Sequence, residues 1–94
     1  MNAPVKALTI YEVASLEAAF TAQIQEQESL KLDLSQLEEL DSAGVQWLLA
    51  LQARKARQGC TLYLSNISDL ALEALKRLGL SAVLNIETQG EGHA

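Results

Sequence analysis

The sequence is poor in the residues from which most catalytic sites and disulfide frameworks are built. It has one cysteine (Cys60), one histidine (His93) and one proline among 94 residues. A single cysteine cannot form an intrachain disulfide. Catalytic triads and histidine-containing metal sites need a histidine held in the core, whereas His93 lies in the last few residues. No glycine-rich phosphate-binding loop is present. We therefore expect no cofactor and no metal, and a non-enzymatic protein is favoured over an enzyme with an unrecognised site.

Basic residues are also few, with 7 Lys and Arg against 12 Asp and Glu and a net charge of −5. A protein that binds nucleic acid needs clustered positive charge, so nucleic acid is not an expected partner. No long apolar run is present, and the chain does not open with a charged segment followed by an apolar one. We therefore expect a cytoplasmic protein with no direct insertion into a membrane.

What the chain does have is apolar content, 49% of its residues, at a length that suits one small domain. We expect a single domain over residues 1–94, with a core over about 5–87 and a flexible tail over 88–94. Residues 1–4 are expected to lie outside the first strand. Eight of the 12 acidic residues fall in residues 1–41, so the first half of the chain is the acidic half.

Short strand patterns alternate with helical patterns along the chain. Period-2 and β-branched stretches predict strands over 5–10, 30–34 and 60–65, and a short apolar run follows at 82–86. Helical spacing predicts helices over 14–27, 44–58 and 69–78, the last two ending at glycines. The fold class is therefore α/β, with a mixed, mainly parallel sheet of about four strands and helices packed on it.

The segment Leu-Asp-Ser-Ala-Gly-Val at 40–45 joins the second strand to the long helix. Asp41 or Ser42 is the expected N-cap, and a cap plus a close-packed glycine alone would explain the pattern. A serine at a helix N-terminus is also exposed and close to free backbone amides. That position tolerates an added phosphate, so Ser42 is suited to act as a switch.

Two neighbouring features have alternative interpretations. Glu38, Glu39 and Asp41 could serve acid/base chemistry or hold a cation, although a solvated acidic turn is the commoner explanation. On the helix, Trp47 and Leu51 lie roughly opposite the predicted apolar stripe of Val45, Leu48, Leu49, Ala53 and Ala56. One or both could be exposed as an interface anchor, or Trp47 could fold over a neighbouring loop.

Residues 30–86 resemble the STAS domain family, whose founding members are bacterial anti-sigma factor antagonists. The resemblance rests on the order of Leu-Asp-Leu-Ser, the 40–45 segment, an apolar helix and a closing Leu-Gly-Leu. The matching stretches are 32–35, 40–45, 48–49, 58–59, 62–66 and 75–80. The family usually has two strands and a Gly-x-Leu-Asp-like turn before the first helix, whereas this sequence predicts one strand followed by Ile-Tyr-Glu-Val at 10–13.

The resemblance implies a domain without catalysis that binds a protein partner around the start of the helix after the motif. In the antagonists the serine after the motif aspartate, by position Ser42, is phosphorylated by a serine-kinase anti-sigma factor. The unphosphorylated form binds the kinase and frees sigma, phosphorylation ends the complex, and a phosphatase resets it. The partner-binding residues expected here are Asp41, Ser42, Ala43, Gly44, Gln46, Trp47 and Leu51.

Short STAS proteins also serve as a subunit of bacterial phospholipid-transport ABC systems, where the domain binds the ATPase. In that alternative Ser42 is a docking and helix-capping residue. Either function is compatible with a monomer or a weak dimer.

Overall fold

The computed structural model describes residues 2–87, which form six short strands and four helices. The strands are β1 (Asn2–Pro4), β2 (Ala7–Leu8), β3 (Leu30–Asp33), β4 (Glu39–Leu40), β5 (Leu62–Ser65) and β6 (Asn85–Ile86). The helices are α1 (Val13–Ala19), α2 (Thr21–Gln25), α3 (Ser42–Arg57) and α4 (Asp69–Arg77). The predicted tail over 88–94, including His93, lies outside the described residues.

The main sheet has four strands in the order β1-β3-β5-β6, and every pair in it is parallel. A second, two-stranded parallel sheet joins β2 to β4. Parallel neighbours need crossover connections, which the helices supply. The prediction of an α/β domain with a mainly parallel sheet of about four strands is confirmed, although the strand pairs of residues 2–87 are all parallel, so the sheet is not mixed as predicted.

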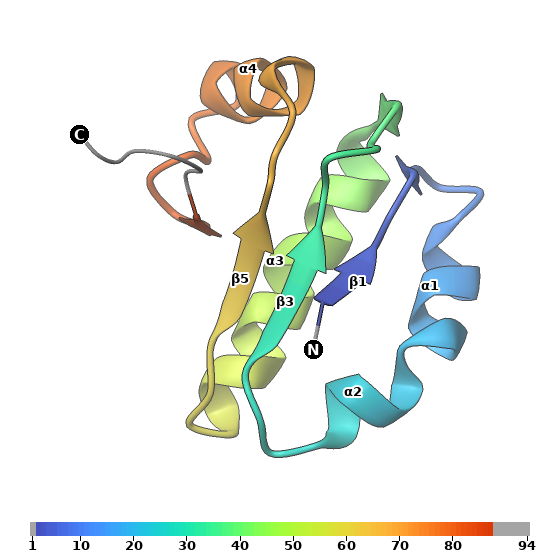
Figure 1. Ribbon diagram of the computed structural model, residues 1–94, viewed down its shortest axis with the longest axis vertical. Helices are drawn as coiled ribbons and strands as arrows, with labels where there is room; N and C mark the ends of the chain where they lie inside the picture. Colours follow the sequence, from blue (N-terminus) through green and yellow to red (C-terminus); the bar gives the residue numbers. More distant parts are fainter. Residues whose placement is uncertain (1, 88–94) are drawn as a thin grey trace.

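Helix α3 lies behind β3 and β5, whereas no described helix crosses in front of them (Figure 1). Helices α1 and α2 also contact α3, so the three helices share one side of the sheet. The core fills the space between these layers. Its fully buried side chains include Leu32 and Leu64 from the sheet and Leu48 from α3.

The N-terminal region has two strands, so the prediction of a single strand over 5–10 is wrong. The first, β1, lies in the segment expected to be outside the sheet, and it pairs with β3 at the sheet edge. An edge strand tolerates Pro4, because the missing amide of proline interrupts no ladder there. The second, β2, pairs with β4, in a segment for which the sequence predicted only a turn.

The predicted helix over 14–27 is interrupted at Phe20, which ends α1 and precedes α2. The backbone of Phe20 leaves the helical region, with φ −105° and ψ 17°. Beyond this break, Ile24 of α2 reaches the core and is 1% exposed. Two short helices can therefore follow the side of α3, where one straight helix would diverge from it.

Helix α3 has one broad buried face, which is turned around the helix axis from the predicted stripe. Ala53 and Ala56 are exposed, whereas Trp47, Leu51 and Lys55 are buried. The buried trio follows the i, i+4, i+8 spacing of one helix face, and its two ends bond to the neighbouring helices. The indole of Trp47 donates to Glu17 of α1, and the ammonium of Lys55 donates to backbone carbonyls of α2 and of the chain that follows it.

Candidate functional site

The turn before α3 is organised by the carboxylate of Asp41. One oxygen, Oδ1, accepts a hydrogen bond of 3.0 Å from the amide of Gly44 and so caps the helix. The other, Oδ2, accepts one of 3.0 Å from the amide of Ile10. The amide of Asp41 itself donates to the carbonyl of Leu8. The prediction that Asp41 or Ser42 is the cap therefore resolves to Asp41, which also ties the start of α3 to the chain after β2.

These hydrogen bonds also determine the protonation of Asp41. The amide of Ile10 is the largest cause, followed by that of Gly44, and both lower the pKa of Asp41 below its ordinary value of 3.8. Hydrogen bonds to the charged form stabilise it. The turn therefore carries a full negative charge at neutral pH.

Replacing Asp41 with asparagine is expected to change the acid sensitivity of the fold. The amide of asparagine can accept from Gly44 through its oxygen, but its nitrogen cannot accept from Ile10. Because the folded-state pKa is lowered, the stabilisation is present above the ordinary pKa and is lost as the pH falls through the lowered one. Asp41→Asn should be less stable than wild type near neutral pH, with a difference that shrinks as the pH falls below the ordinary pKa of 3.8. Urea unfolding across this range measures it, and a difference that grows on acidification contradicts the assignment.

Ser42 occupies the first position of α3, and its side chain is exposed. Gln46 is exposed one turn further along the same face, and Ala43 is half-buried. Because Asp41 supplies the cap, the start of the helix does not depend on the Ser42 hydroxyl. Ser42 and Gln46 therefore present an accessible polar face beside the Asp41 turn.

The other residues expected to bind a partner are buried. Gly44 packs against the backbone of β2, where an added Cβ would stand 2.0 Å from the carbonyl oxygen of Leu8. Trp47 is 6% exposed and Leu51 is fully buried, so the expectation that either is an exposed anchor is wrong. The reason is that α1 and α2 cover this side of α3, and the Trp47 indole donates a 2.8 Å hydrogen bond to Glu17. These three residues therefore belong to the packed interior and are not accessible to a partner.

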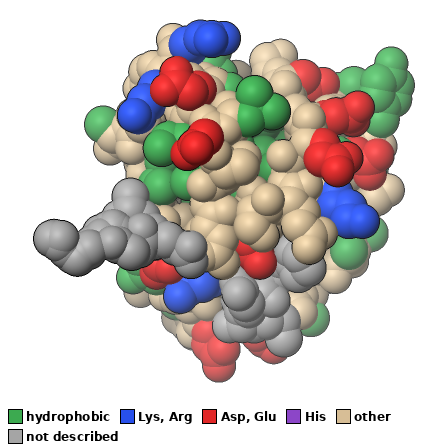
Figure 2. Space-filling view, turned by 45° about the horizontal axis from the view of Figure 1, so that its top comes forward, with side chains coloured by type: hydrophobic (Ala, Val, Ile, Leu, Met, Phe, Trp, Pro, Cys, Tyr) green, Lys and Arg blue, Asp and Glu red, His purple; other side chains and the backbone are tan. Residues whose placement is uncertain are grey.

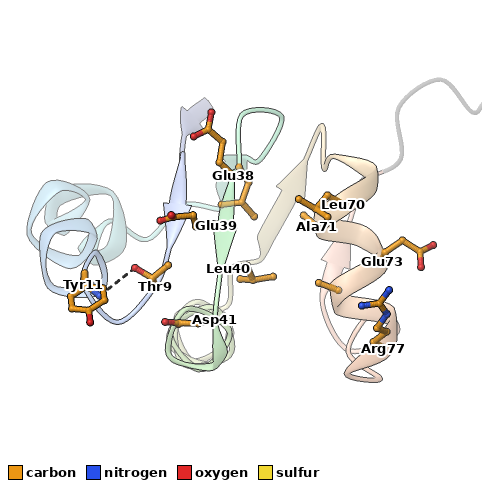
Figure 3. A pocket seen from close by; sticks show the side chains of 12 residues that line it. Thr9, Tyr11, Glu38, Glu39, Leu40, Asp41, Leu70, Ala71, Glu73 and Arg77 are labelled. Atoms are coloured by element: carbon orange, nitrogen blue, oxygen red, sulfur yellow. Dashed lines mark hydrogen bonds between the residues drawn. The ribbon is translucent and has the colours of Figure 1, made fainter.

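A groove opens between the turn and α4, with a volume of about 610 Å³. It is lined by Thr9, Tyr11, Leu37, Glu38, Glu39, Leu40, Asp41, Leu70, Ala71, Glu73, Ala74 and Arg77. Figure 3 shows β4 on one wall and α4 on the other, with the side chain of Leu40 extending from β4 into the space between them. On the surface of this end of the molecule, hydrophobic side chains are interspersed with acidic ones (Figure 2).

The acidic residues before α3 form part of this groove wall and do not form a metal site. Glu38 and Glu39 are exposed, and both carboxylate oxygens of Asp41 accept hydrogen bonds from backbone amides. Within residues 2–87, no three Asp, Glu, Cys or His side chains come together in a way that could hold a metal ion. The arrangement fits the solvated acidic turn among the predicted alternatives.

Sequence analysis missed the exposed apolar residues around the turn. Ile10 is 63% exposed and Tyr11 is 86% exposed, directly after the strand that packs under α3. Leu70 on α4 is 70% exposed. The available signal was the Ile-Tyr pair in a polar connection, but its proximity to Asp41 depends on the pairing of β2 with β4. Such residues are typical of protein-binding surfaces.

The family model described as "Mlab, STAS domain" matches residues 6–86. The chain belongs to the STAS domain family. STAS domains are generally non-enzymatic modules that interact with protein partners, which agrees with an accessible turn and an apolar groove. No curated protein matches this STAS domain. None of its helices within residues 2–87 is long and apolar enough to cross a membrane.

Proposed function

We propose that this STAS domain is a cytoplasmic regulatory module that binds a serine-kinase anti-sigma factor at the Asp41–Ser42 turn and is released when Ser42 is phosphorylated. The observation that carries the proposal is that capping and exposure belong to different residues of the turn. Asp41 caps α3, while Ser42 stands exposed at its first position. A modification of Ser42 can therefore alter the surface without removing the cap.

In the proposed reaction the γ-phosphoryl group of ATP bound to the kinase passes to Ser42 Oγ, which loses its proton, and ADP is the leaving product. A phosphate at a helix N-terminus is compatible with the positive end of the helix dipole, so the fold persists. The added group carries a charge of about −1.5 to −2 and must be accommodated by any partner that contacts the turn. Its bulk and desolvation cost then release the partner, and a phosphatase restores the hydroxyl.

A second candidate is favoured by the description of the matching family model, which names Mlab. In that case the domain is the STAS subunit of a phospholipid-transport ABC system, and the same turn docks on its ATPase. Ser42 then serves contact and local helix structure only. The complex would be constitutive, and its formation would need no kinase.

Substitution of Ser42 separates the two candidates. Wild type, Ser42→Ala and Ser42→Glu serve as parallel baits in native extract, with Ser15→Glu as a control at an exposed serine of α1. We expect wild type, Ser42→Ala and Ser15→Glu to retain a serine kinase. Ser42→Glu should lose at least tenfold in affinity for it, or about 1.4 kcal/mol, measured with the purified partner. Equal binding of a kinase by all four baits contradicts the switch, and equal retention of a transporter ATPase establishes the second candidate.

A further inference from the structure

The groove between β4 and α4 has an apolar floor. Ala71 is 3% exposed, Leu40 and Ala74 are half-buried, and Leu70 stands on its rim at 70% exposure. Residues 70 and 74 are one helical turn apart, so they lie on one face of α4. The side chains of Ala71 and Ala74 are small, so another chain can approach the backbone of α4 closely. Filling an accessible apolar groove of this kind with apolar side chains is favourable, because it removes apolar surface from water.

The rim of the groove is strongly acidic. Glu38, Glu39 and Asp41 lie on the β4 side and Glu73 on α4, against the single guanidinium of Arg77 among the lining residues. Figure 3 shows the two glutamates of the β4 wall directed away from the floor. Positive side chains on an occupant would pair with this rim, whereas negative ones would be repelled.

We propose that this groove binds a segment of the protein partner in which apolar side chains are flanked by Lys or Arg. The proposal extends the proposed function by giving the chemistry of the partner, and it rests on that function for the existence of one. The groove adjoins the turn through Asp41, so a partner seated in it also contacts the Ser42 region. A charge on Ser42 has the sign of the rim and does not weaken attraction for the basic segment; it acts on contacts at the turn.

The test is a titration of the ¹⁵N-labelled protein, followed by NMR, with a designed amphipathic helical peptide of leucine and lysine. A peptide with glutamate in place of every lysine is the control ligand. We expect the lysine peptide to shift the amide signals of Leu40, Leu70 and Ala74, and the glutamate peptide to leave them unchanged. Added salt should weaken binding, because part of the attraction is between exposed charges.

Three protein variants locate the contact. The double variant Glu39→Lys/Glu73→Lys should bind the lysine peptide at least tenfold more weakly, and Leu70→Ala several-fold more weakly. Glu26→Lys/Glu28→Lys, an equal charge change at two exposed residues between α2 and β3, should bind like wild type. All changed side chains are exposed, and a well-dispersed spectrum confirms that each variant is folded.

The proposal is overturned if the signals that shift lie elsewhere, if the glutamate peptide binds as well, or if the charge reversal has no effect. Signals of the groove that move with protein concentration alone would also overturn it, because the occupant would then be a second copy of this chain. Ser42→Glu should bind the peptide like wild type. The two proposals can therefore be told apart. Peptide binding can confirm the groove even if Ser42→Glu does not release the kinase, and the groove can be contradicted even if Ser42→Glu does release it.

Discussion

Substituting Gly44 with alanine is expected to destabilise the protein by about 3 kcal/mol, although alanine is the better helix former by about 1 kcal/mol. The reversal comes from the contact between α3 and β2. The new Cβ would meet the carbonyl oxygen of Leu8 at 2.0 Å and its carbonyl carbon at 2.4 Å. Both are backbone atoms, so no rotamer change relieves the clash. The start of α3 must instead move away from β2, where Leu8 is fully buried.

Urea unfolding of Gly44→Ala and wild type gives this difference directly. Ala50→Gly, at an exposed position of the same helix, is the matched control for helix propensity and should cost about 1 kcal/mol. The displacement should also disturb the bonds of Asp41 to Gly44 and Ile10, visible as shifts of those two amide signals. A Gly44→Ala protein as stable as wild type would show that α3 does not depend on this close approach.

The parts of the fold that local sequence determines were predicted well. The start of α3 follows from a capping aspartate. Its end and that of α4 follow from Gly59 and Gly79, whose φ angles of 75° and 73° favour glycine. The alternation of leucine with polar residues at 30–34 identifies β3. Each of these signals lies within a few residues of the structure it predicts.

The missed features depend on contacts between distant residues. The strand β4 has two residues, and it exists because Glu39 and Leu40 pair with Ala7 and Leu8. The groove lies between β4 and α4, which are about 30 residues apart in the sequence, so no local sequence pattern predicts it. Burial of Trp47 and Leu51 likewise requires α1 and α2 to pack against α3. The sequence therefore located the turn and Ser42, but not the surface that surrounds them.

Lys55 is the clearest case of a residue whose role comes from tertiary structure, and Lys55→Met is expected to cost about 3 kcal/mol. The side chain is fully buried. Its ammonium donates to the carbonyls of Gln23 at 2.6 Å, Glu26 at 2.8 Å and Glu28 at 2.9 Å. The lysine thus satisfies carbonyls at the end of α2 and in the connection to β3, besides any interaction with the dipole of its own helix. Methionine keeps the length and apolar stem but leaves three carbonyls without this donor.

The comparison that isolates this effect is Arg57→Met, which removes one positive charge from an exposed position in the same last turn of α3. It should change stability by no more than about 0.5 kcal/mol. Hydrogen exchange in Lys55→Met should increase first in α2 and in residues 26–29, since their carbonyls lose the ammonium. If Lys55→Met is as stable as Arg57→Met, the buried ammonium contributes no net stability. Packing of Ile24 and the hydrogen bond from the Gln58 side chain to its carbonyl must then hold α2 against α3. Because α2 covers part of the buried face of α3, loss of the Lys55 contacts should loosen the packing of α2 and leave the Asp41 cap at the other end of the helix intact.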